Sequence, residues 1–99
     1  MSKSVTAWDS GKNLNALRKK IDAYDNSLMK ILRARFNAVK EVGKFKKKHN
    51  LPLCDRKRQK EVLKIRIQQG KTNRLSSKFI GKLYNLIFDE AIRIQGCEK

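Results

Sequence analysis

The fold is decided by one long stretch, residues 13–50, which reads NLNALRKKIDAYDNSLMKILRARFNAVKEVGKFKKKHN. Its apolar residues recur at spacings of three and four, which at about 100° per residue places them on one face of an α-helix. The members of this face are Leu14, Leu17, Ile21, Tyr24, Leu28, Ile31, Leu32, Val39 and Val42. We therefore predict a single helix over the whole stretch.

Two cations fall on the same apolar face. Arg35 lies seven residues after Leu28, and Lys46 lies seven residues after Val39. Because taking a cation out of water is costly unless a counter-charge meets it, these positions predict a buried acidic partner or a bound anion.

Length and composition limit the fold class. Ninety-nine residues suffice for one small domain, and 39% hydrophobic with 34% charged residues is typical of a folded helical protein. We predict an all-α domain over residues 13–96, with a flexible leader over residues 1–12 and a tail over residues 97–99. No apolar run is long enough to cross a bilayer and the polar start lacks a signal-peptide core, so we expect a cytoplasmic protein.

Two shorter helices should follow the long one. Pro52 disfavours helical geometry before it, so the first helix should end near Asn50. Asp55 is a suitable N-cap for a second helix that Gly70 would stop, and Ser76 is a suitable N-cap for a third. The apolar positions of the third helix are Phe79, Ile80, Leu83, Tyr84, Ile87, Ala91 and Ile94.

The long helix also has a consequence for assembly. Roughly 36 residues at about 1.5 Å each make a rod of about 54 Å, whereas a compact domain of about 100 residues has a radius of gyration near 13 Å. Helical patterns longer than about 25 residues usually pack against a partner helix, so we predict a homodimer.

Charge and cysteine usage narrow the range of partners. Twenty-five Lys and Arg against nine Asp and Glu give a net charge of +16, which attracts phosphate backbones. The cations are spread along every helix, however, and no nucleic-acid-binding signature is present, so a basic dimer that binds RNA or DNA without catalysis is only an alternative. Cys54 and Cys97 form no CxxC pair and accompany one histidine, so we expect two free thiols and no metal site.

Several polar residues lie on or beside apolar faces. The set comprises Arg18, Arg35, Lys46, Arg58 and Gln95. Together they offer many hydrogen-bond donors and almost no acceptors, which favours a cavity for a small molecule that carries two carboxylates.

The order of these residues resembles the all-helical chorismate mutase family. The resemblance spans about residues 14–95 and rests on LR-x-x-ID-x-x-D at 17–25, Arg35, VGKFK at 42–46, Pro52-x-x-Asp55-x-x-Arg58 and Gln95. It implies an intertwined homodimer of three-helix chains, each with one very long helix. It also implies rearrangement of the dianion chorismate to prephenate without a metal or cofactor.

The resemblance further implies a role for each site residue. Arg18 would reach the active site of the partner chain, and Arg35 and Arg58 would hold the two carboxylates. Lys46 and Gln95 would donate to the ether oxygen of the breaking bond, so that Lys46, Gln95 and Arg35 are the expected catalytic residues. Asp55 would lie near the ring hydroxyl.

Two positions of the substrate site depart from the family pattern. Gln59 stands where glutamate is common, and Ala91 stands where a serine helps to hold a carboxylate. These changes leave two other substrates open, isochorismate in a pyruvate-lyase of the same fold and amino-substituted chorismate. The lyase branch tends to carry an apolar residue at this position, so the polar Gln59 favours the mutase.

Overall fold

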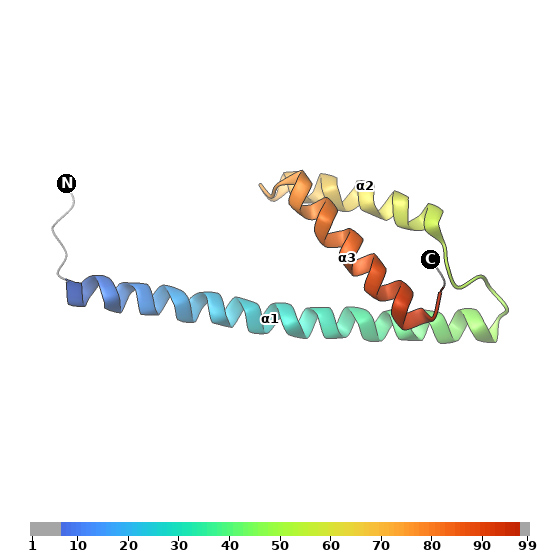
Figure 1. The fold of residues 1–99 in the computed structure, drawn as a ribbon, viewed down its shortest axis with the longest axis horizontal. Helices are drawn as coiled ribbons and strands as arrows, with labels where there is room; N and C mark the ends of the chain where they lie inside the picture. The colour runs from blue at the N-terminus through green and yellow to red at the C-terminus, as the bar shows by residue number, and fades with distance from the viewer. Residues whose placement is uncertain (1–6, 98–99) are drawn as a thin grey trace. The chain divides into compact units, whose positions relative to one another are not determined.

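The computed structural model describes residues 7–97, with side chains from residue 13 onward. These residues form three α-helices, α1 (Ala7–Lys48), α2 (Arg56–Thr72) and α3 (Ser77–Gln95), and no strand occurs among them (Figure 1). The prediction of an all-α chain with one very long helix is confirmed. None of the helices described is long and apolar enough to cross a membrane.

Helix α1 begins earlier than predicted. It starts at Ala7 instead of near Asn13, so the second half of the predicted leader has a helical backbone. Residues 1–6 and 98–99 lie outside the described residues, so the leader, the tail and the domain limits stay predictions. The helix ends at Lys48, and Asn50 then adopts φ 56°, a left-handed conformation that asparagine tolerates better than most residues.

Helix α2 has the predicted start but not the predicted end. The side chain of Asp55 accepts a hydrogen bond of 2.9 Å from the backbone N–H of Arg58, which confirms Asp55 as the N-cap. Gly70 does not stop the helix, which continues to Thr72 and is capped by Asn73. Gly70 is buried, and a Cβ there would lie 2.7 Å from Cγ1 of Ile80. This glycine therefore allows α2 and α3 to approach each other closely.

Helix α3 begins where its sequence predicts. The Ser76 hydroxyl accepts from the Phe79 N–H at 3.2 Å, and Gly96 closes the helix with φ 78°. The buried apolar side chains are Val62 of α2 and Ile80, Ile87, Phe88, Ala91 and Ile92 of α3. Phe79, one of the apolar positions of the third helix, is 55% exposed, and Ile80 takes the place facing α2.

The chain divides into two compact units, Met1–Arg35 and Phe36–Lys99. In the first unit the apolar seam of α1 is uncovered, with exposed fractions between 45% and 64% at Leu14, Leu17, Ile21, Tyr24, Leu28 and Ile31. In the second unit α2 and α3 lie against each other as a helical hairpin (Figure 1). The core described above belongs to this hairpin.

A disulfide joins Cys54, just before α2, to Cys97, just after α3. The prediction of two free thiols was wrong. Sequence spacing gave no motif because the two residues are 43 positions apart, yet the hairpin brings their Cα atoms to 5.7 Å, within the range for a disulfide. The bond ties the amino-terminal end of α2 to the carboxyl-terminal end of α3.

Reduction of this disulfide should lower the free energy of unfolding by about 4 kcal/mol. A cross-link that closes a loop of 43 residues restricts the unfolded chain by roughly that amount. Urea unfolding with and without reductant, followed by circular dichroism, measures the difference. The double variant Cys54→Ser/Cys97→Ser should give one curve under both conditions, and two reactive thiols per chain in the untreated, denatured protein would contradict the bond.

Candidate functional site

Lys46 is half-buried near the end of α1. Its Nζ donates a hydrogen bond of 3.2 Å to the carbonyl oxygen of Leu53, in the segment that leads to α2. This bond uses one of three ammonium donors, so the group keeps hydrogen-bonding capacity for a ligand.

Gln95, the last residue of α3, is held against α1. Its Nε2 donates to the carbonyl oxygen of Val39 at 3.5 Å, and its Cγ lies 3.4 Å from the point that a Cβ on Gly43 would occupy. Val39, Gly43 and Lys46 follow at spacings of four and three, so they share one stripe of α1. Gln95 of α3 therefore contacts the same stripe of α1 from which the Lys46 side chain projects.

Asp55 and Arg58 occupy the first turn of α2, and both are exposed. Asp55 already serves as the N-cap, so one of its carboxylate oxygens is directed at the helix backbone. The guanidinium of Arg58 makes no hydrogen bond or ion pair with any residue in the described part of the chain. A free, exposed guanidinium beside a helix N-terminus can accept an anion.

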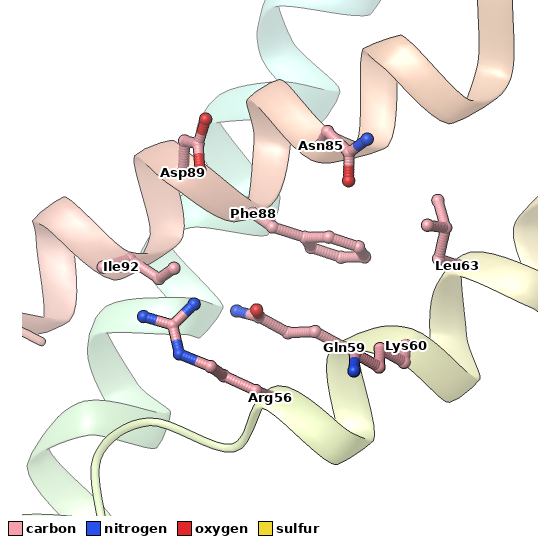
Figure 2. Close-up of a pocket in the computed structure, with 8 residues that line it drawn as sticks. All are labelled: Arg56, Gln59, Lys60, Leu63, Asn85, Phe88, Asp89 and Ile92. Carbon is pink, nitrogen blue, oxygen red and sulfur yellow. The ribbon is translucent and has the colours of Figure 1, made fainter. Parts of the chain in front are cut away.

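Gln59 lines a cavity of about 200 Å³ between α2 and α3. The other residues that line it are Arg56, Lys60, Leu63, Asn85, Phe88, Asp89 and Ile92. Figure 2 shows the side chains of Arg56, Gln59 and Phe88 pointing into the space between the two helices. Ala91 is buried one turn beyond Phe88 on α3, where its methyl group offers no hydrogen bond.

The cavity contains residues that the sequence reasoning missed. Arg56, Lys60 and Leu63 are on α2 together with Gln59, and the four follow one another at spacings of three, one and three. Such spacings place side chains on one face of a helix. The pattern was present in the sequence, but a solvated basic helix face has the same spacing as a cavity wall. Two additional cations therefore stand beside the neutral amide of Gln59.

The remaining two site candidates belong to the first unit. Arg18 is exposed on α1, on the part of the helix that carries the uncovered seam. Arg35 is half-buried, and its Nη1 is buried without a hydrogen-bond partner among the described residues. A buried guanidinium nitrogen without an acceptor is rare in folded proteins, so Nη1 of Arg35 keeps the capacity to donate a hydrogen bond to an anion.

One neighbouring cation is already neutralised. Arg93 donates two hydrogen bonds, of 2.8 and 2.6 Å, to the carboxylate of Glu90 one turn earlier on α3. These bonds with Arg93 lower the pKa of Glu90 and raise the pKa of Arg93. Arg93 is thereby a poor candidate for ligand binding, unlike Arg35 and Arg58. The described residues hold no cluster of His, Cys, Asp and Glu that could bind a metal ion.

A sequence profile of the family described as chorismate mutase type II matches residues 17–96. The chain belongs to this family. The match covers every site candidate from Arg18 to Gln95, so it confirms the resemblance given by the sequence motifs.

Individual relatives agree with the profile. The bifunctional chorismate mutase/prephenate dehydratase of Escherichia coli strain K12 is 35% identical over 82 residues, which are 83% of this chain and 21% of that protein. The protein of the same name from Buchnera aphidicola of Schizaphis graminum is 30% identical over 86 residues, 87% of this chain and 22% of the relative. The chain thus spans about a fifth of the length of these curated relatives.

A relative with a different printed substrate also matches. The 4-amino-4-deoxychorismate mutase of Streptomyces pristinaespiralis is 27% identical over 82 residues, which are 83% of this chain and 64% of that protein. This relative is thus named for a chorismate that carries an amino group in place of a hydroxyl.

Proposed function

We propose that this protein is a chorismate mutase, which converts chorismate to prephenate by an intramolecular Claisen rearrangement in aromatic amino acid biosynthesis. The observation that carries the proposal is the family match over residues 17–96. The buried, unpartnered Nη1 of Arg35 supports it, because chorismate is a dianion and supplies carboxylate acceptors.

In this proposal the arginines bind and orient the substrate. Arg35 and Arg58 hold the two carboxylates, and Arg18 of the partner subunit completes the site. Two anchored ends keep the enolpyruvyl side chain folded over the ring, which removes most of the orientational entropy from the barrier. Asp55 and Gln59 lie toward the ring hydroxyl, and Ala91 forms part of the apolar wall.

Lys46 and Gln95 supply the electrostatic part of catalysis. Negative charge grows on the ether oxygen as the carbon–oxygen bond lengthens, so donors placed there bind the transition state more tightly than the substrate. The shared stripe of α1 supports this pairing of an ammonium with an amide. The reaction requires no cofactor, because no group or electron leaves the substrate.

The uncovered seam of α1 supports an intertwined homodimer. Its residues follow spacings of three, four, three, four and three from Leu14 to Ile31, the repeat by which two helices interlock. The Cys54–Cys97 disulfide is unusual for the cytoplasm, where thiols are kept reduced, so the cytoplasmic location stays a prediction.

The first test measures turnover of three purified substrates. We expect prephenate from chorismate, slower reaction of 4-amino-4-deoxychorismate, and no pyruvate from isochorismate. Lys46→Ala should lower kcat on chorismate by about 10²–10³-fold, the usual loss for one transition-state donor. Salt-dependent binding to random duplex DNA, together with no turnover of any substrate, would instead favour the nucleic-acid alternative.

A complementation experiment tests the role of Arg18. Arg18→Ala and Arg35→Ala chains should each be inactive. When equal amounts are mixed, about half of the dimers contain one chain of each kind, and one of the two sites in such a dimer keeps both arginines. The mixture should therefore recover about a quarter of the natural specific activity. Co-purification of the two chains through different affinity tags shows that mixed dimers form. Their formation without recovery, or a stable folded monomer by sedimentation, would contradict the assignment.

The variant Gln59→Glu tests the contact with the ring hydroxyl. A carboxylate accepts a stronger hydrogen bond than an amide, whereas its protonated form loses that advantage. The variant should therefore gain kcat/KM on chorismate as pH rises through the carboxyl pKa, ordinarily about 4.3, by something like tenfold. The natural protein should show no such step, and matching pH profiles would place Gln59 outside the site.

A further inference from the structure

Gly43 lies in the interior of α1. In a helix interior, glycine is less favourable than every residue but proline. Its backbone is not in the left-handed region, since Gly96 is the glycine with positive φ among the described residues. No turn or cap therefore requires it. Gly43 is nevertheless buried, unlike every other residue of α1 whose burial is described. The residue that covers Gly43 should therefore explain why a glycine stands at this position.

Gln95 covers Gly43. An added Cβ would lie 3.4 Å from Cγ, 3.9 Å from Cβ and 4.0 Å from Cα of Gln95, so the aliphatic stem of the glutamine rests on the glycine. From there the amide reaches the carbonyl oxygen of Val39, one turn earlier on α1. At 3.5 Å this hydrogen bond is long, so packing of the stem on Gly43 directs the amide more than the bond does.

The surroundings of this contact allow Gln95 to move if it is pushed. A cavity of about 190 Å³ lies beside it, lined by Lys40, Gly43, Lys44, Lys47, Ile94 and Gln95. A side chain larger than a methyl at position 43 would therefore displace the glutamine stem instead of meeting a closed wall. The amide would then leave the stripe that it shares with Lys46.

We propose that Gly43 is a positioning residue, whose missing side chain lets Gln95 lie against α1 and present its amide beside Lys46. The inference rests on the proposed function, in which these two groups donate to the ether oxygen. Preorganised donors lose their effect when they are misplaced, and a shift of about 1 Å can cost about 10²-fold in rate. Gly43 thus acts on catalysis through Gln95 and touches no substrate atom itself.

The test compares Gly43→Ala and Gly43→Val with a matched control, Gly81→Val. Gly81 lies inside α3, and the nearest neighbour of a Cβ there would be Cδ1 of Ile67, at 3.8 Å. Gly81→Val therefore changes helix propensity as Gly43→Val does, but it does not touch Gln95. We expect Gly43→Ala to keep most of kcat, since its methyl sits at the edge of contact. Gly43→Val should lower kcat on chorismate by about ten- to hundredfold with little change in KM, and Gly81→Val should stay within about twofold.

Two further measurements separate positioning from a general structural effect. In a Gln95→Ala background, Gly43→Val should cause no additional loss of kcat, because the group it displaces is already gone. The side-chain amide signal of Gln95 in ¹H–¹⁵N spectra should shift in Gly43→Ala and stay in place in Gly81→Ala, which reports on position without any turnover.

The outcomes are distinguishable. An unmoved Gln95 signal, or a loss in Gly43→Val that adds fully to that of Gln95→Ala, would overturn the role of Gly43 while leaving the mutase assignment intact. A natural protein without mutase activity would overturn the proposed function, and the spectra would still decide whether Gly43 positions Gln95.

Discussion

The apolar seam on the amino-terminal part of α1 is the constraint on which the arrangement of the chain depends. Leu17, Ile21, Tyr24 and their neighbours are about half to two thirds exposed, although each would release water if it were covered. The hairpin of α2 and α3 has its own core and belongs to the other unit of the chain. In the proposed homodimer, a second copy of α1 supplies the missing cover with the same spacing, and it brings Arg18 to the site of the partner chain.

The second constraint is charge. The chain holds 25 basic and nine acidic residues, so most cations have no acidic side chain to pair with. Arg93 has found one in Glu90, whereas the Nη1 of Arg35 has no partner in the part of the chain described. In the proposed function, a dianionic substrate corrects this imbalance where it binds. The same donors would then act on the charge that develops in the transition state, so that binding and catalysis draw on one set of side chains.

Local chemistry made much of the fold readable from the sequence. Asp55 and Ser76 were identified as N-caps because capping depends on residues within one helical turn. Gly70 and the cysteine pair were misread because their roles depend on distant residues, Ile80 in one case and a position 43 residues away in the other. The same holds for the candidate site: motif order predicted Lys46 and Gln95 as site residues, but the contact of Gln95 with α1 required the structure. The face of Arg56 and Lys60 was overlooked, since a solvated basic face and a cavity wall have the same spacing.

The neutral Gln59 acquires a physical meaning in this cavity. A glutamate at this position would stand on the same face as Arg56 and beside Lys60, and its charge would offset part of theirs. In the proposed function, the amide keeps a hydrogen-bond acceptor for the ring hydroxyl without adding a second negative charge to a cavity that Asp89 already lines. The exchange therefore trades a stronger contact to one hydroxyl for a less negative potential around it. In that proposal the potential disfavours an ammonium group on the ring, which agrees with chorismate as the substrate in place of its amino-substituted form.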